Sequence, residues 1–129
     1  MTRILIVEDH RLFAQSLELL LGQRLAEAEG GPAEFCRAAT VADGIAIADR
    51  EGPFDAAIVD LVLPDGNGAD LVRELKAAYP RTRVAVLSAT PDLSGAMDAG
   101  ADDAISKGVP LLEIVARLEG LAVGDGTAA

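Results

Sequence analysis

Short aliphatic runs alternate five times with longer segments whose apolar residues recur at helical spacing. Most of these runs are nearly continuous in Val, Ile, Leu and Ala, which is typical of strands buried on both faces of a parallel sheet. The runs cover residues 3–7, 34–39, 57–59, 83–87 and 103–106. Strands that alternate with helices favour right-handed crossover connections. The sequence therefore predicts an α/β fold with a five-stranded parallel sheet and helices on both faces.

The segments between the runs predict five helices. They cover about residues 11–25, 41–50, 71–79, 91–99 and 110–122. In the first helix, Phe13 and Leu17 begin an apolar stripe that should face the core. Thr40, with Asp43 three residues later, predicts a capping box at the start of the second helix.

The fourth helix has an N-terminal signal but a weak interior. Thr90 is expected to cap it, with Pro91 at its first helical position. Ser94 and Gly95 lie inside the segment, and both disfavour a helix relative to alanine. We therefore expect a short, weak helix at this place.

The length of 129 residues suits one domain with a sizeable core. We expect this domain to span residues 1–122, with residues 123–129 as a flexible tail or the start of a linker. Half of the residues are apolar but only 3% are aromatic, so the core should be aliphatic.

The charge and hydropathy of the chain exclude some functions. The net charge of −10 argues against direct binding to nucleic acid or to a membrane surface, because both require a basic face. A spanning helix needs about 18 consecutive apolar residues, and none of the apolar runs is that long. We therefore expect a cytoplasmic location.

Polar residues that can perform chemistry follow four of the predicted strands. They are Glu8 and Asp9 after the first strand, Asp60 after the third, Ser88 after the fourth and Lys107 after the fifth. Because the carboxyl ends of parallel strands meet at one edge, where ligands bind in open α/β sheets, these side chains should converge. Three carboxylates at close range repel one another. The ammonium of Lys107 and a hard divalent ion such as Mg²⁺ would relieve this repulsion.

A carboxylate placed beside a divalent ion, an ammonium and a hydroxyl is suited to accept a phosphoryl group. Asp60 would attack phosphorus in line, and Lys107 would neutralise the equatorial oxygens. Ser88 would donate a hydrogen bond to one of these oxygens. The attack needs no general base, because a carboxylate is already deprotonated at pH 7.

Four motifs occur in an order and at a spacing that resemble the receiver domain of bacterial two-component response regulators. They are ILIVEDH, IVDLVLPDGNG, VLSA and GADDAISK. The resemblance covers essentially all of residues 3–121. It implies the flavodoxin-like fold, with the parallel strands in the order 2-1-3-4-5. The residues around Glu8 and Asp9 most resemble transcription regulators that carry a helix-turn-helix DNA-binding domain after the receiver. The chain could therefore be the N-terminal part of such a regulator, or a single-domain protein.

The resemblance also assigns roles to the strand-end residues. Glu8, Asp9 and Asp60 would bind Mg²⁺ or Mn²⁺ through their carboxylates. A backbone carbonyl, which we assign to Val62, would complete the protein ligands.

Asp60 would take its phosphoryl group from a phosphohistidine on a sensor histidine kinase or a phosphotransfer protein. Ser88 would be the switch hydroxyl and Lys107 the phosphate-binding lysine. Phosphorylation would then switch an output or partner surface of the domain. Formation of a homodimer is one possible result. In this interpretation the domain is a signalling module and not a dedicated enzyme.

Two departures from the family pattern lie on the expected output face. Ala104 stands where the family usually has an aromatic residue, three positions before the lysine. Ser88 and Lys107 are 19 positions apart, which is shorter than the resemblance implies. We therefore expect a phosphorylation signal to travel by reordering of residues 90–99 and not by rotation of an aromatic ring.

Two other functions are consistent with parts of the sequence. A degenerate receiver would act only in dimerisation or docking, independently of phosphorylation. Ala104 and the shortened fourth helix favour this alternative, whereas the complete set of strand-end residues argues against it. A Mg²⁺-dependent phosphatase with an Asp nucleophile would need a second Asp two residues later as the general acid. Val62 occupies that position and argues against a phosphatase. His10 is expected to be a solvated residue of the first helical turn, and Asp65 a turn former beside the site.

Overall fold

A computed structural model describes residues 1–28, 31–90 and 92–123 of the chain. In chain order the elements are β1 (Thr2–Val7), α1 (Arg11–Glu27), β2 (Ala33–Ala38), α2 (Val41–Glu51), β3 (Ala56–Asp60), β4 (Val62–Leu63), β5 (Gly66–Asn67), α3 (Gly68–Ala78), β6 (Arg83–Ser88), α4 (Ser94–Asp98), β7 (Asp103–Ser106) and α5 (Leu111–Ala122). The expected Pro91 position and the tail beyond residue 123 lie outside the described residues. The predicted domain boundary at residue 122 stays a prediction.

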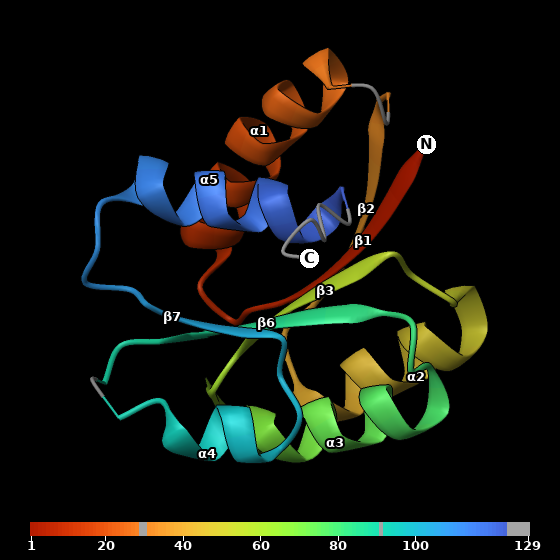
Figure 1. The fold of residues 1–129 in the computed structure, drawn as a ribbon. Coiled ribbons are helices and arrows are strands. Elements are labelled where there is room, and N and C mark those ends of the chain that lie inside the picture. Colours follow the sequence, from red (N-terminus) through yellow and green to blue (C-terminus); the bar gives the residue numbers. More distant parts are fainter. Residues whose placement is uncertain (29–30, 91, 124–129) are drawn as a thin grey trace.

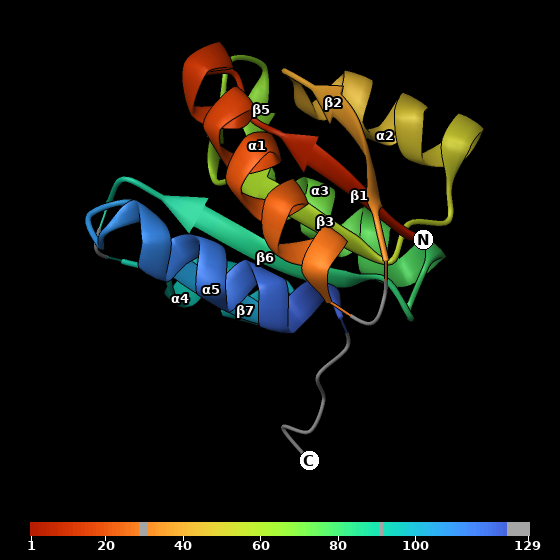
Figure 2. The same cartoon turned by 90° about the horizontal axis from the view of Figure 1, so that it is seen from above.

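The five long strands form one parallel sheet in the order β2-β1-β3-β6-β7. Counted among the parallel strands alone, this is the order 2-1-3-4-5, because β4 and β5 form a separate antiparallel hairpin. Helices α1 and α5 cover one face of the sheet, and α2, α3 and α4 cover the other (Figure 1). The view from above shows α1 and α5 lying side by side across the sheet (Figure 2). The predicted flavodoxin-like fold is confirmed.

The sheet divides the aliphatic core into two halves, because successive side chains of a strand point to opposite faces. In β1, Leu5 and Val7 pack on the side of α2 and α3, whereas Ile4 and Ile6 pack on the side of α1 and α5. All four side chains are completely buried. The central strands are therefore apolar on both faces, which explains their continuous aliphatic runs.

The predicted cap of α2 is confirmed. The hydroxyl of Thr40 accepts a hydrogen bond of 3.0 Å from the backbone N–H of Asp43, so one of the free donors at the helix start is satisfied.

The predicted start of α4 is wrong. The helix begins at Ser94 and has only five residues, and its N-cap Leu93 makes no side-chain capping bond. Thr90 does not cap it, because the Thr90 hydroxyl and backbone N–H both bond to Oγ of Ser88. Asp92 instead accepts bonds from the backbone N–H and the hydroxyl of Ser94, which forms a local turn before the helix.

The helices of the described residues are too short or too polar to cross a membrane.

Candidate functional site

Two buried carboxylates and one ammonium meet at the carboxyl edge of the sheet. Glu8 follows β1 and Asp60 ends β3, the neighbouring strand, and their exposed fractions are only 3% and 4%. The Nζ atom of Lys107, just after β7, lies 2.8 Å from Oε1 of Glu8 and 3.1 Å from Oδ2 of Asp60. The predicted convergence of these three side chains is therefore found.

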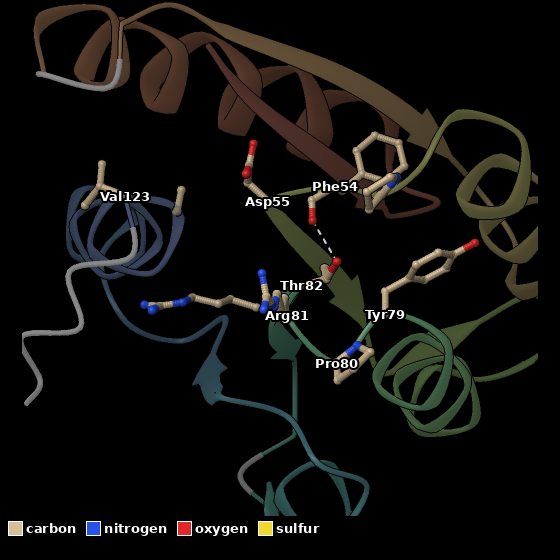
Figure 3. A pocket seen from close by; sticks show the side chains of 10 residues that line it. Phe54, Asp55, Tyr79, Pro80, Arg81, Thr82 and Val123 are labelled. Atoms are coloured by element: carbon tan, nitrogen blue, oxygen red, sulfur yellow. Dashed lines mark hydrogen bonds between the residues drawn. The ribbon is translucent and has the colours of Figure 1, made fainter.

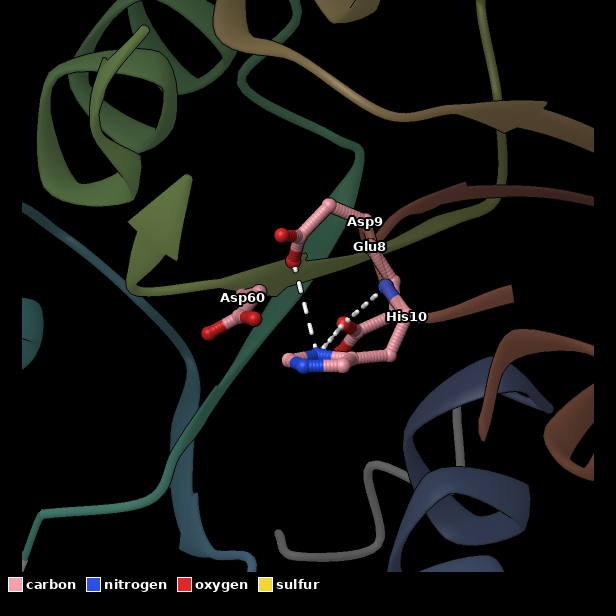
Figure 4. Close-up of side chains that lie close together, drawn as sticks. All are labelled: Glu8, Asp9, His10 and Asp60. Atoms are coloured by element: carbon pink, nitrogen blue, oxygen red, sulfur yellow. Dashed lines mark hydrogen bonds and ion pairs between the residues drawn. The ribbon is translucent and has the colours of Figure 1, made fainter. Parts of the chain in front are cut away.

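Asp9 and His10 complete a cluster of metal-binding groups. Glu8, Asp9, His10 and Asp60 each offer one ligand atom, and these atoms all lie within 4.8 Å of one another (Figure 4). The Glu8 carboxylate is nearly fully buried, and its Oε1 atom has an ion-pair partner but no well-aligned hydrogen bond. The carboxylate oxygens of Glu8, Asp9 and Asp60 are ligands of the type that a hard divalent cation prefers.

The charges of the cluster also fit a divalent cation. Glu8, Asp9 and Asp60 bring three negative charges, and Lys107 brings one positive charge. Two negative charges are left, and uncompensated charge is costly in a partly dry site. The residues present therefore fit Mg²⁺ or Mn²⁺, as predicted from the sequence.

The environment of Lys107 favours its charged form. Burial by itself would lower the pKa of the amine, but its ion pairs with Glu8 and Asp60 outweigh burial and raise the pKa above its usual value. The ammonium also lies over the aromatic ring of Phe13, with the ring centroid 4.9 Å from Nζ. Lys107 is therefore held as a cation at the site.

Ser88 is buried at the end of β6, in the strand next to Asp60. Its Oγ lies 2.9 Å from Oγ1 of Thr90 and accepts a 3.1 Å bond from the Thr90 backbone N–H. The hydroxyl proposed as the switch is thus bonded to the segment that leads to α4.

Ala104, on the neighbouring strand β7, is partly buried, and its carbonyl accepts a bond from Arg117.

The loop after Asp60 is held tightly against the site. Val62 donates its backbone N–H to Oδ1 of Asp60 over 3.1 Å, so the residue expected to supply a carbonyl ligand adjoins the acceptor. Gly68 donates its N–H to the carbonyl of Leu61 over 2.8 Å. A Cβ atom at Gly68 would overlap the backbone of Asp60, so only glycine fits there.

Two contacts of this site were not predicted from the sequence. Asp65, expected to be a turn former, also accepts bonds of 2.7 Å and 3.0 Å from the first two N–H groups of α2, at Val41 and Ala42. His10 is 73% exposed at its side chain, as expected for a solvated residue, but its Nδ1 lies 3.1 Å from Oε2 of Glu8. The spacing of these residues in the sequence gave no signal of either contact.

One cavity lies away from the carboxylates. It has a volume of about 580 Å³. Residues near the amino ends of β3 and β6 and at the end of α5 line it (Figure 3). There the hydroxyl of Thr82 donates a 2.7 Å bond to the carbonyl of Phe54. A smaller pocket of about 280 Å³ adjoins Glu8 and Asp9.

Comparisons with known proteins agree with this geometry. Residues 4–119 match the response regulator receiver domain family. The KDP operon transcriptional regulatory protein KdpE of Escherichia coli is 37% identical over 123 residues, covering 92% of this chain and 50% of KdpE. The chain spans about half or less of the length of the curated relatives it matches.

Solved structures of receiver domains have the same fold. A CheY-like receiver domain from Methanospirillum hungatei has a TM-score of 0.79 and 25% identity, covering 100% of this chain and 99% of that one. The BeF3-activated receiver domain of DrrB, from Thermotoga maritima, has a TM-score of 0.76 and 25% identity, covering 94% of this chain and 97% of that one. With its family match over most of its length, its sheet order and its carboxylate edge, the chain belongs to the receiver domains of two-component response regulators.

Proposed function

We propose that Asp60 is the phosphoacceptor of this receiver domain and that Glu8 and Asp9 hold a divalent cation beside it. The observation that carries the proposal is the pairing of the buried Asp60 carboxylate with the Lys107 ammonium inside the acidic cluster. A buried carboxylate with a cation at its side is oriented for attack, and the ammonium can move from the carboxylate to a phosphoryl oxygen.

The transfer step follows from these groups. An Asp60 oxygen forms a bond to phosphorus while the bond from phosphorus to the imidazole nitrogen of a phosphohistidine breaks. The nitrogen keeps the electron pair of that bond and takes up a proton. Bound Mg²⁺ or Mn²⁺ would neutralise charge on the transferring phosphoryl group. The carboxylates of Glu8, Asp9 and Asp60, with the Val62 carbonyl, would hold the ion.

Lys107 and Ser88 would act on the phosphoryl oxygens. Lys107 donates a charge-assisted hydrogen bond to one equatorial oxygen, and such bonds are stronger than those between neutral groups. Ser88 would turn its hydroxyl from Thr90 to another of these oxygens. The phosphoryl group would thereby change the contacts of the segment before α4.

The domain would receive its signal from a histidine kinase or a phosphotransfer protein. In a longer protein it would control an output, as the name of KdpE indicates for transcription. Dimerisation of the phosphorylated domain is one way in which it could act. The net charge of −10 argues against direct binding of nucleic acid by this domain.

Phosphorylation by small donors tests the proposal. With Mg²⁺ and phosphoramidate or acetyl phosphate, intact-mass spectrometry should show one added phosphoryl group on the wild-type domain. Asp60→Asn should show none. Asp55→Asn is the matched control, because Asp55 lies before β3 at the opposite edge, where it accepts the N–H of Arg3. A wild type that takes no phosphoryl group, or an Asp60→Asn variant that still takes one, would contradict the proposal.

The alternative is a receiver that acts only in dimerisation or docking. Ala104 and the five-residue α4 favour it, because both weaken the expected output face. In that case the wild type would keep its oligomeric state and its partner binding with or without the phosphodonor.

A further inference from the structure

Phe13 of α1 lies against the ammonium of the phosphate-binding lysine. The ring centroid is 4.9 Å from Nζ of Lys107. The ring is only partly buried, at the margin of the core half formed with α1 and α5. The sequence pattern predicted a core position for Phe13, but the structure gives its ring a cationic neighbour.

The surroundings of Lys107 make this contact energetically relevant. The lysine side chain is only 17% exposed, so little water competes for its ammonium. The face of an aromatic ring attracts a cation, and the attraction is stronger where water is excluded. Glu8 and Asp60 are the two charged partners of the ammonium, at 2.8 Å and 3.1 Å.

Both charged partners of Lys107 also interact with other groups in the proposed reaction. Glu8 and Asp60 would turn to the divalent cation, and Asp60 would also form the bond to phosphorus. The attraction of these carboxylates for Lys107 is then shared with the ion. The Phe13 ring makes no bond to the ion or to phosphorus, so its attraction for the ammonium persists throughout the reaction.

We propose that Phe13 is a positioning residue, whose ring holds the Lys107 ammonium where it can meet the phosphoryl oxygens. The inference rests on the proposed function of Asp60 and Lys107. Phe13 acts through Lys107, and it should therefore affect binding of the phosphoryl group more than binding of the metal ion.

A matched pair of variants separates this role from packing. Phe35 of β2 is also partly buried against the same half of the core, but its ring lies beside Gly22. Phe13→Leu and Phe35→Leu each replace a ring with an aliphatic side chain. Phe13→Tyr keeps the ring face.

Beryllofluoride serves as the phosphoryl analogue, and ¹⁹F NMR measures its binding in the presence of Mg²⁺. Phe13→Leu should weaken beryllofluoride binding and slow phosphorylation by phosphoramidate, each by about three- to tenfold. Its Mg²⁺ affinity, measured by calorimetry, should stay unchanged. Phe35→Leu should change neither ligand's affinity, and Phe13→Tyr should behave as the wild type.

Three results would overturn the inference while the proposed function stands. The first is that Phe13→Leu binds beryllofluoride as tightly as Phe35→Leu does. The second is that Phe13→Leu loses Mg²⁺ affinity by the same factor as beryllofluoride affinity. The third is that Phe13→Tyr is as impaired as Phe13→Leu. If the wild type takes neither beryllofluoride nor a phosphoryl group, the proposed function fails and the inference fails with it.

A second measurement needs no variant to fold. A proton that lies over an aromatic ring is shifted upfield in its NMR spectrum. The ε-methylene protons of Lys107 in the wild type should show this shift, and their resonance at the ordinary lysine position would exclude the proposed contact.

Discussion

The ammonium of Lys107 lies closer to Glu8 than to Asp60, at 2.8 Å from Oε1 against 3.1 Å from Oδ2. Glu8 is not the expected phosphoacceptor, and its carboxylate is nearly fully buried. In the metal-free domain, Lys107 is therefore a counterion for two buried carboxylates. A divalent cation would neutralise the same carboxylates, so the ion and the ammonium serve overlapping electrostatic roles.

Replacement of Lys107 tests this overlap. Lys107→Met should lower the free energy of unfolding of the metal-free domain by about 1–3 kcal/mol, because Glu8 and Asp60 lose their cation. Mg²⁺ should restore much of this loss, since it binds the folded state. Urea unfolding with and without Mg²⁺ measures both effects. Lys76→Met is the control: Lys76 binds Asp102 over 3.0 Å on another part of the domain. A metal-free Lys107→Met domain as stable as the wild type would contradict the counterion role.

A methyl group at Gly68 should disturb the loop after Asp60. Gly68→Ala would place Cβ against the Asp60 carbonyl, and we expect a loss of about 1–3 kcal/mol from overpacking. Mg²⁺ affinity should fall with it, because the loop carries Val62. Gly120→Ala in α5 is the opposite case, with open space around the new methyl group. It should stabilise the domain by about 0.5–1 kcal/mol. Chemical denaturation compares the two, and equal effects would refute the steric argument.

The contribution of Asp65 to stability should depend on pH. Bonds from the N–H groups of Val41 and Ala42 lower the pKa of its carboxyl in the folded protein. The unfolded value is about 3.9. A lowered folded pKa means that the stabilisation is fully present above the unfolded pKa and is lost as the pH falls through the folded pKa.

Thermal unfolding from pH 7 to pH 2 checks this dependence. The melting temperature of the wild type should exceed that of Asp65→Asn at pH 7, and the gap should close in acid. A gap that stays constant over the whole range would show that the Asp65 charge plays no part.

The segment before α4 should respond to a phosphoryl analogue. If Ser88 turns toward beryllofluoride, the Thr90 hydroxyl loses its partner and amide protection in residues 93–99 should fall. Thr90→Val lacks this hydroxyl, so its protection should already be low and should change less. Hydrogen exchange read by mass spectrometry measures both, with residues 111–122 as an internal reference. Unchanged protection in the wild type on adding beryllofluoride would eliminate this route of signal transfer.

The sheet and most of the site could be predicted from the sequence because both follow from local patterns. A polar residue at the end of an apolar run marks a strand end, and parallel strands bring their ends together. Glu8, Asp60 and Lys107 could therefore be placed at one edge. The order of the strands was predicted from the family resemblance, because the aliphatic runs alone do not determine it.

Two of the contacts that escaped prediction are tertiary, and one is local. Phe13 has the spacing of any core residue of a helix, and its neighbour Lys107 is 94 positions away in the sequence. Asp65 caps a helix that begins 24 positions earlier. Thr90 has the local signal of a helix cap, but its hydroxyl and N–H bond to Ser88 instead. In the first two cases a neighbour that is distant in the sequence determines the role of the side chain. In the third, bonds to Ser88, two residues earlier, replace the expected helix cap.

The division of the core by the sheet has a consequence for how such a chain can diverge. Ile4 and Ile6 never meet Leu5 and Val7, because the strand backbone separates the two sets. Volume changes at sites without shared neighbours usually combine additively. Substitutions in the core on the α1 and α5 side therefore need no compensating substitutions beneath α2 and α3. The two halves of the core can change independently during evolution.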